Sequence, residues 1–514
     1  MSNPSDSPQI DYTDKDYESL RQAMLDLVPQ MLPEWTNLSA NDPGVVLLEL
    51  FAYMGDLILY YQDRIANESF LDTAVERRSV INLLRLIGCE LRPPQPASAD
   101  LTLLFKSDYK PADASVLIDI NSEFKTTGAD GNTVSFRYTR KPLTIKLAAL
   151  PEKKYDGDGK QYVWYERLPV IQVDRIVKNE AVGASDGGVG QRFKLAGTAG
   201  TAGTPLIADS LEVYVDGFLW ERKDTLFYSD SNAKHYVVRW DEADVAWIEF
   251  GDGRFGQIPR VPQSGQNNII ASYLVGGGVK GNVPGGSFFK AGGINDPASS
   301  LKLIFSPVAA SGGMAHEECA QAALRGPQLF RARSRAVTAE DYEAYATDFG
   351  VAKVRARAAG WNIVELYVAP AGGGMPSDTM KEDLRLYFED KKMLSTLIEV
   401  NDPVYVGVDI IGELFIKSQY LREFVKQDAE DALRQLLAFD RVDFGGVLYI
   451  SKAYEVIEAI EGVDGVTITG FTRETPAPEG VDPNPVWGVL RFGWNEIPVL
   501  SDMEFNVTGG QSGY

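Results

Sequence analysis

Apolar residues between positions 43 and 67 recur at the spacing of one helix face. Leu47, Phe51, Met54, Ile58, Tyr61 and Ile65 follow one another at alternating steps of four and three. This heptad-like seam is typical of an α-helix that packs along its length on other helices. Asp42 is suited to cap the helix, and Pro43 suits the first helical position, where a missing N–H costs nothing. The pattern therefore predicts a long helix that begins at Pro43.

Two further helices flank this one. Tyr17, Leu20, Met24, Leu27 and Met31 repeat at three-four spacing, and Thr13 with Asp16 resembles a capping box. Downstream, Thr73 and Glu76 form a second candidate capping box. The helix after it contains Val80, Leu83, Leu84, Leu86 and Ile87, with Gly88 as its stop. Residues 1–96 are thus expected to be a helical segment, and residues up to about Gln9 to be disordered.

The seam needs a covering partner, because a lone helix of this kind is marginal in water. One interpretation is an ordinary helical core within this chain. The other is a bundle formed with helices of other chains. The pattern alone favours the first, and the second is the more specific hypothesis.

The period changes after Leu101, where short alternating runs such as LTLLF, TVSFRYT and VAWIEF are separated by Gly, Asp, Asn and Pro. These are strand and turn signals, so residues 97–294 are expected to form one or two antiparallel β domains. Residues 295–330 look like a linker. Residues 331–475 alternate helices and strands and predict an α/β domain, in which Thr338 and Asp341 can cap a helix. Residues 476–514 are expected to be a C-terminal strand extension.

The α/β region contains a weak internal echo. Tyr342-Glu343, Gly350-Val351 and Val354 align without gaps with Tyr454-Glu455, Gly462-Val463 and Val466. This pattern indicates two copies of a helix–turn–strand unit and a ferredoxin-like arrangement, although chance remains an alternative. The expected fold class is therefore multidomain α+β, with an N-terminal helical bundle segment, central antiparallel β domains and a C-terminal ferredoxin-like domain.

Composition narrows the function classes. The 72 acidic residues exceed the 50 basic ones, which gives a net charge of −22 and disfavours nucleic acid as a partner. Cys89 and Cys319 are the only cysteines, which supports neither a disulfide framework nor a zinc site and fits a reducing cytosol. The N-terminus lacks the apolar core of a signal peptide. Glu49 interrupts the best apolar run, so no membrane span is expected.

Candidate chemistry is sparse. Residues 251–256 read GDGRFG and match the glycine pattern of a dinucleotide fingerprint, but Pro259 and Pro262 follow where a helix is required, so tight turns are the better interpretation. His235 and His316 are the only histidines, and no catalytic or metal-binding spacing includes them. Asp156 and Asp158 lack the other ligands of a calcium loop. We therefore expect no catalytic residue, cofactor or metal.

Several stretches resemble one known family. The run from Asp42 to Leu101, the combination FGDGRFGQIP and YLVGGGVKGNVP, the segments RAVTAEDYEAYA and GGVLYISKAYEVIEAIEGV, and NEIPVL near the end are similar to baseplate J-like proteins. These are wedge proteins of contractile phage tails, R-type bacteriocins and related contractile injection systems. The resemblance covers nearly the whole chain in the expected order.

The resemblance implies a structural protein of a tail baseplate, assembled in the bacterial cytoplasm. Its implied partners are a second copy of itself, a smaller wedge protein, a sheath-initiator-like baseplate protein, and central hub and spike proteins. It implies that the seam from Leu47 to Ile65 joins a helical bundle, and that residues 331–475 pair copies into a ring that responds to sheath contraction. Tyr342, Tyr345, Tyr454 and Ile457 are the expected pairing residues. The alternative is a tail-associated glycan-binding or glycan-cleaving protein.

Overall fold

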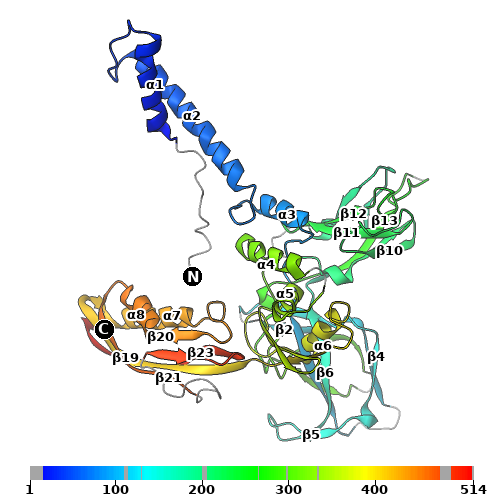
Figure 1. The fold of residues 1–514 in the computed structure, drawn as a ribbon. Coiled ribbons are helices and arrows are strands. Elements are labelled where there is room, and N and C mark those ends of the chain that lie inside the picture. The colour runs from blue at the N-terminus through cyan, green and yellow to red at the C-terminus, as the bar shows by residue number, and fades with distance from the viewer. Residues whose placement is uncertain are drawn as a thin grey trace.

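The computed structural model describes residues 15–108, 114–128, 130–198, 205–263, 265–296, 299–332, 335–474 and 488–511. Within them, a helical rod projects from a body of β and α/β units (Figure 1). The expected disordered start, up to about Gln9, lies outside the described residues, as does Thr13.

Two antiparallel helices, α1 (Tyr17–Met31) and α2 (Pro43–Asn67), make up the rod. Asp16 caps α1 by accepting a hydrogen bond from the Ser19 N–H, and the Ser19 hydroxyl oxygen accepts one from the Asp16 N–H. The capping box therefore lies three residues further along the chain than the expected Thr13–Asp16 pair. Asp42 caps α2 by accepting from the Gly44 N–H at 2.8 Å, and Pro43 is its first residue, as predicted.

Helix α3 (Arg77–Leu86) is the root by which the rod joins the body. The expected Thr73–Glu76 capping box is wrong. The Thr73 hydroxyl instead donates to the Asn67 carbonyl at 2.7 Å, and the carboxylate of Glu68 accepts from the Val75 and Glu76 N–H groups at 3.1 Å. Glu68 thereby ties the end of α2 to the start of α3. Gly88, the predicted stop, adopts φ +78°.

The first β unit is an eight-stranded antiparallel sheet in which the order β14-β2-β3-β6-β1-β15 is extended by β4 on β2 and β5 on β6. Its strands are β1 (Ser98–Lys106), β2 (Ser115–Thr127), β3 (Thr133–Arg137), β4 (Leu143–Lys146), β5 (Glu152–Lys154), β6 (Gln161–Gln172), β14 (Lys290–Asn295) and β15 (Leu301–Phe305). The last strand corrects one expectation. Residues 295–330 are not a simple linker, because they contain β15 and most of α4 (Cys319–Ala332).

The second β unit is a seven-stranded sheet of order β7-β13-β9-β10-β11-β12-β8. Its strands are β7 (Arg175–Gly183), β8 (Arg192–Lys194), β9 (Glu212–Val215), β10 (Phe218–Arg222), β11 (His235–Trp240), β12 (Ala246–Phe250) and β13 (Ile269–Val275). The pair β10–β11 is parallel, so the expected purely antiparallel pairing is wrong at this one place. The four described 3₁₀ turns are Leu147–Ala149, Ala196–Thr198, Ala208–Ser210 and Val279–Gly281.

The C-terminal part contains two separate three-stranded sheets, β16-β17-β18 and β21-β19-β23, and a small β20–β22 pair. Its elements are α5 (Ala339–Phe349), β16 (Lys353–Gly360), β17 (Ile363–Ala369), α6 (Asp378–Tyr387), β18 (Leu397–Asn401), β19 (Val404–Leu421), α7 (Arg422–Leu436), β20 (Val447–Tyr449), α8 (Ile450–Glu458), β21 (Val463–Arg473), β22 (Val489–Arg491) and β23 (Glu496–Gln511). Neither sheet has the four strands of a ferredoxin-like fold within the described residues. The predicted Thr338–Asp341 capping box at the start of α5 is present.

The two segments of the internal echo have similar local structure. Gly350, at φ +116°, directly follows the end of α5, whereas Gly462, at φ +108°, lies beyond the end of α8 at Glu458; a strand begins soon after each glycine. A residue with a β-carbon would be strained in that conformation. This ending is also a common way to stop a helix, so the internal repeat stays a prediction.

Candidate interaction surface

One face of α2 is covered by α1. Val45 and Ala52 are buried on this face, and Arg21 of α1 pairs with Glu49 at 2.9 Å. A β-carbon on Gly55 would lie 3.0 Å from a methyl carbon of Leu20, so this glycine lets the two helices approach closely. The intramolecular contacts of α2 therefore account for only one of its faces.

The predicted seam lies on a different face, which this chain leaves uncovered. All six of its residues are exposed, with between 55% and 69% of each accessible to solvent: Leu47, Phe51, Met54, Ile58, Tyr61 and Ile65. The helix was predicted correctly, and the hypothesis that its own chain covers the seam is wrong. An uncovered row of this length needs a partner of some kind.

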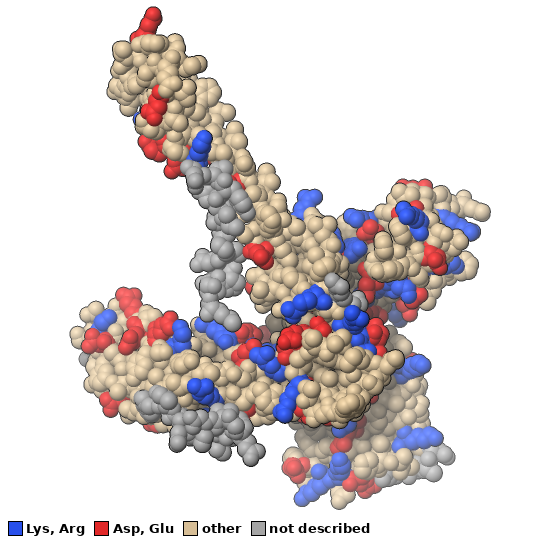
Figure 2. All heavy atoms as spheres, viewed as in Figure 1, with Lys and Arg blue, Asp and Glu red and all other residues tan. Residues whose placement is uncertain are grey.

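A second uncovered row runs beside the first. Its members are also exposed, at steps of four and three: Val46, Leu50, Tyr53, Leu57 and Tyr60. The sequence analysis overlooked this row, although its spacing is as regular as that of the seam. Helix α2 thus carries three apolar faces, of which α1 covers one. In the space-filling view the rod has few charged residues compared with the body (Figure 2).

The apolar character of α2 also corrects the expectation about membranes. By length and composition α2 is the one described helix that could cross a bilayer, and only 11% of its most apolar window is buried within the chain. Glu49 therefore does not exclude a span on length and composition alone. These properties are shared by any helix that other helices surround on most sides.

A shallow groove of about 360 Å³ lies where the second row meets α1. Tyr17, Val46, Glu49, Leu50 and Tyr53 line it. Its walls are mainly apolar, and its one carboxylate is already paired with Arg21. The groove can accept an apolar side chain from a neighbouring helix, in the manner of a knob entering a hole.

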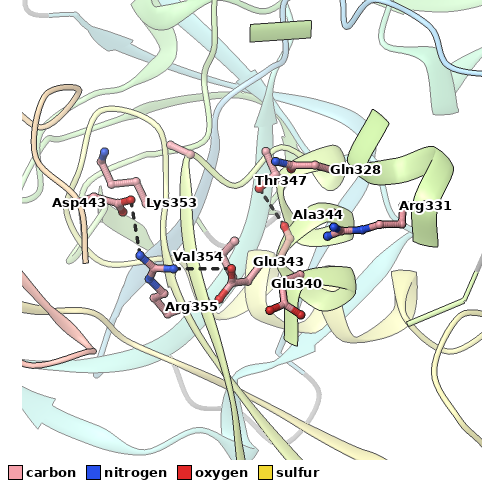
Figure 3. Close-up of a pocket in the computed structure, with 11 residues that line it drawn as sticks. Gln328, Arg331, Glu340, Glu343, Ala344, Thr347, Lys353, Val354, Arg355 and Asp443 are labelled. Carbon is pink, nitrogen blue, oxygen red and sulfur yellow. Dashed lines mark hydrogen bonds and ion pairs between the residues drawn. The ribbon is translucent and has the colours of Figure 1, made fainter. Parts of the chain in front are cut away.

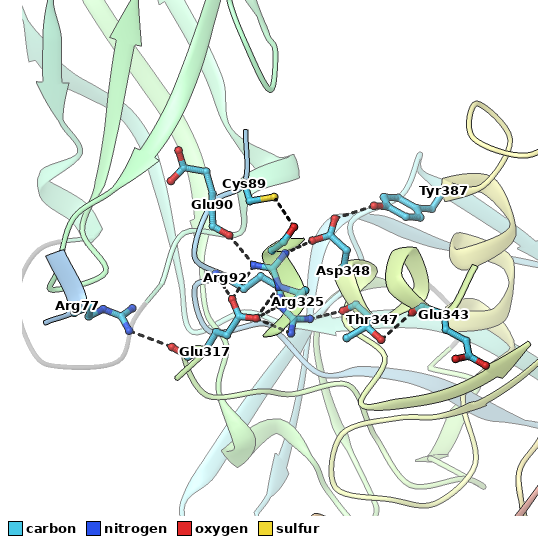
Figure 4. A network of polar contacts seen from close by, with 11 residues as sticks. Arg77, Cys89, Glu90, Arg92, Glu317, Arg325, Glu343, Thr347, Asp348 and Tyr387 are labelled. Atoms are coloured by element: carbon cyan, nitrogen blue, oxygen red, sulfur yellow. Dashed lines mark hydrogen bonds and ion pairs between the residues drawn. The ribbon is translucent and has the colours of Figure 1, made fainter. Parts of the chain in front are cut away.

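At the other end of the rod, a buried charge network fastens the root to the body (Figure 4). The guanidinium of Arg325 in α4 donates to both oxygens of Glu317, at 2.7 and 2.8 Å, and to Asp348 of α5 at 2.6 Å. Arg92, which follows the root, donates to Glu317 through its backbone N–H at 3.0 Å and its side chain at 3.1 Å. The side chains of Arg325 and Glu317 are only 5% and 2% exposed. We call this set the junction network.

Within the junction network, the attraction between opposite charges offsets the cost of burying them. Burial alone would raise the pKa of Glu317, but hydrogen bonds and charge from Arg325, together with Arg92, outweigh burial and hold that pKa below its usual range. The phenol of Tyr387 donates to Asp348 at 3.0 Å, and burial followed by the charge of Asp348 raises the pKa of that phenol. Paired charges of this kind are costly to separate because each would remain buried alone.

A polar cavity of about 290 Å³ lies where α4, α5 and β16 meet the C-terminal unit (Figure 3). Arg355 crosses it between Glu343 at 3.7 Å and Asp443 at 3.8 Å, and the ammonium group of Lys353 donates to the Val442 carbonyl. Burial lowers the pKa of Lys353. These contacts join the two α/β units, and the cavity lining contains cations and carboxylates in equal number.

The expected pairing residues need correction. Tyr342, Tyr345 and Ile457 are 2%, 6% and 0% exposed, so they belong to the cores of the C-terminal units. Tyr454 is partly buried, and its hydroxyl accepts a hydrogen bond from the Ile468 N–H at 3.0 Å. Amphipathic helical spacing identified these residues but could not distinguish a surface from a core.

Residues 251–256 form the tight turn that was predicted. Gly253 and Gly256 have φ +84° and +87°, and a β-carbon on Gly251 would lie 2.3 Å from the backbone of Gly256. The Asp252 carboxylate accepts from the N–H groups of Arg254 and Phe255. Asp158 is engaged in its own turn by the Lys160 N–H and the Tyr162 hydroxyl. No cluster of metal-ligating side chains occurs among the described residues.

The fold brings together one set of residues that the sequence did not suggest. The hydroxyl of Ser229 lies 2.8 Å from His235 Nδ1, and His235 Nε2 lies 3.4 Å from Glu221. Ser229 is only 7% exposed and Glu221 is bonded to Lys223. The hydroxyl is thus shielded from any substrate, and the contacts fix the segment between β10 and β11.

Cys89 and Cys319 are free thiols. Cys89 follows the end of α3, and Cys319 is the first residue of α4 rather than part of a linker. Both pack against the small apolar core between these two helices. Burial raises the pKa of both thiols.

Comparisons with known proteins give the rod its context. The family described as bacteriophage baseplate protein, N-terminal domain, matches residues 16–86. Residues 16–86 are thus similar to a baseplate N-terminal domain. The matched residues comprise α1, α2 and α3, so the two uncovered rows and the root all lie within this domain. The resemblance to baseplate proteins is confirmed for these residues.

No curated protein matches the chain. Among solved structures, the chain is similar to one in "Cryo-EM structure of the anti-feeding prophage (AFP) baseplate, 6-fold symmetrised". The identity is 13% and the TM-score 0.33, with 97% of this chain and 96% of that chain covered. Because these values are low, the functional argument rests on the baseplate N-terminal domain and on the residues of the rod.

Proposed function

We propose that this chain is a structural component of the baseplate of a contractile tail, and that α2 binds helices of other baseplate proteins. The observation that carries the proposal is the coincidence of two uncovered apolar rows with the baseplate N-terminal domain. Helix association buries such rows, and each fully buried Leu, Ile or Phe side chain contributes about 1.5–3 kcal/mol. Six seam residues alone therefore supply a large driving force for assembly.

In the detailed form of the proposal, the chain is a wedge component. The seam and the second row bind a second copy of the chain and a smaller wedge protein, and residues 331–475 contribute to pairing of copies. A ring of such wedges surrounds the central hub and follows the sheath when it contracts. Two uncovered rows on one helix support the idea of two partner helices.

The first experiment tests the rod. Leu47→Asp combined with Ile58→Asp places two charges in the seam, and we expect loss of co-purification with the neighbouring baseplate proteins when all are expressed together. A matched control places two aspartates on exposed polar positions of the rod, Gln30→Asp with Gln62→Asp, and should leave co-purification intact. Unchanged co-purification of the seam variant would contradict the bundle.

The second experiment tests the location. A tag at the C-terminus is located by gold labelling in purified sheathed particles from the source cell. We expect label in a ring at the distal end of the sheath. Label at fibre tips, or protein that binds purified cell-wall glycans and enters no particle, would instead support the glycan-binding alternative.

A further inference from the structure

The second β unit is attached to the rest of the chain at two places of different character. One is covalent: the chain enters it from β6 at Val173–Asp174 and leaves it from β13 at residues 276–278. The other is a set of polar contacts with helix α3. The buried core of the second β unit and the small core around α3 share no residue. Without a common apolar core, the polar contacts determine how the two parts are held together.

The covalent attachment is narrow and rich in glycine. Gly276 has no room for a side chain, since a β-carbon would lie 2.9 Å from the Gln172 carbonyl oxygen. Gly277 and Gly278 have φ +145° and +90°. The two chain crossings are adjacent, and the outgoing one contains these three glycines, so residues 276–278 can serve as a pivot about which the unit rotates with small backbone changes.

The polar attachment joins arginines of α3 to an acidic hairpin. The turn between β11 and β12 reads Asp-Glu-Ala-Asp at residues 241–244, and Figure 1 places α3 beside these strands. Arg77 Nη2 lies 2.5 Å from Asp244 Oδ1, with both side chains 21% exposed. Arg85 donates to the Trp240 carbonyl at 2.9 Å. Glu90, which follows α3, pairs with Arg239 of β11.

Few other charged or titratable side chains surround the Arg77–Asp244 contact. His316, from the segment before α4, has its Nδ1 atom 3.6 Å from Asp244. Arg77 also donates to the Glu317 carbonyl at 3.1 Å, which connects the contact to the junction network (Figure 4). Arg78 reaches Glu242 only at 3.8 Å, and both of those side chains are exposed. The Arg77–Asp244 pair is thus the best-protected direct charge contact between α3 and the hairpin turn.

We propose that the Arg77–Asp244 pair, with Arg85 and Glu90 beside it, is a releasable electrostatic clamp. When closed it holds the second β unit at a fixed angle to the rod. When it opens, the unit turns about the glycine pivot at residues 276–278 while both cores stay intact. Both side chains of the pair are 21% exposed, so water can solvate the separated charges when the clamp opens. The proposal does not depend on what the rod binds.

The test measures the angle as a distance in the full-length chain. Spin labels are placed at two exposed positions, Leu86→Cys on α3 and Lys194→Cys on β8, in a background in which both native cysteines are serine. Electron–electron double resonance should give one narrow distance distribution at low salt. Arg77→Glu and Asp244→Arg should each broaden or shift the distribution, and Asp244→Asn should do so to a smaller degree. Circular dichroism confirms that each variant is folded.

The decisive experiment exchanges the charges of Arg77 and Asp244. Arg77→Glu combined with Asp244→Arg restores the ion pair in reverse, and we expect the narrow distribution to return. Arg78→Glu is the matched control, since it makes the same charge change one residue away and should have little effect. The proposal is overturned if the single variants keep the narrow distribution, if the exchanged pair does not restore it, or if Arg78→Glu broadens it equally.

Discussion

The rod and the junction network invert the usual distribution of side chains. The rod exposes two rows of large apolar residues that soluble proteins ordinarily bury. The junction network buries arginine and glutamate side chains that proteins ordinarily expose. The two regions are joined by one short helix, α3. In the proposed assembly, contacts outside the chain cover the apolar rows of the rod, whereas the network completes its own contacts inside the chain.

The largest effect is expected from breaking the junction network. Glu317→Gln removes one charge and leaves Arg325 and Arg92 without their shared partner, so we expect the free energy of unfolding to fall by about 3–5 kcal/mol. Glu76→Gln removes the partner of Arg64 in a pair that is about half exposed, and should cost at most about 1 kcal/mol. Chemical denaturation followed by fluorescence measures both. Equal effects would mean that the network is no more than a surface pair.

Matched leucines test the apolar half of the comparison. Leu84→Ala lies in the core between α3 and α4, where Leu84 is 0% exposed, and should cost about 2–5 kcal/mol. Leu47→Ala lies in the seam, and in the isolated chain it should change stability by no more than about 0.5 kcal/mol. Differential scanning calorimetry of dilute protein compares them. A large cost at Leu47 would show that the isolated chain already buries its seam, for example by pairing with a second copy.

Acid should weaken the junction network. The pKa of Glu317 is lower in the folded chain than its ordinary value of about 4.3, so the unfolded state binds more protons as the pH falls past that value. The stabilisation by Glu317 is complete above about pH 5 and is lost as pH falls through its folded pKa. Thermal unfolding from pH 6 to 3 should therefore show a smaller decline for Glu317→Gln than for the unmodified chain. Parallel declines would contradict the assigned shift.

The smallest effect concerns the free end of the rod. Asp42→Ala removes the cap of α2, and the local cost is about 0.5–2 kcal/mol. Because this end lies far from the body, the loss should appear as faster hydrogen exchange of the first-turn amides, with global unfolding unchanged. A lowered global stability would mean that the rod and the body unfold as one cooperative unit.

The sequence predicted the helices of these two regions better than it predicted what their side chains contact. Asp42 and Pro43 marked the start of α2, and the seam residues lie on that helix as predicted, because local chemistry and helical period decide both. The sequence could not show which residues of α2 are exposed, since the periodicity is the same for a row that α1 covers and for a row that α1 leaves uncovered. For that reason Tyr342 and Ile457 were expected at a surface but lie in a core.

Contacts between residues that are distant in the sequence were the other feature that the sequence did not predict. Glu68 caps α3 from eight residues before Glu76, a separation that no local capping pattern includes. Arg92, Glu317 and Asp348 meet at Arg325 although more than two hundred residues separate the first from the others. Nothing in the local sequence at these positions distinguishes them from ordinary surface charges. Only the fold brings them together.

The 25 residues of α2 give the rod a further property, which is mechanical. At 1.5 Å per residue the helix is about 38 Å long, and Glu68 fixes its inner end to α3 with two hydrogen bonds. Such a helix acts as a lever arm: a rotation of about 10° at the root displaces the outer end by about 7 Å, which exceeds the 5.4 Å of one helical turn. A small rotation of α3 beside Arg325 would therefore move the outer end of the rod sideways by more than the rise of one helical turn.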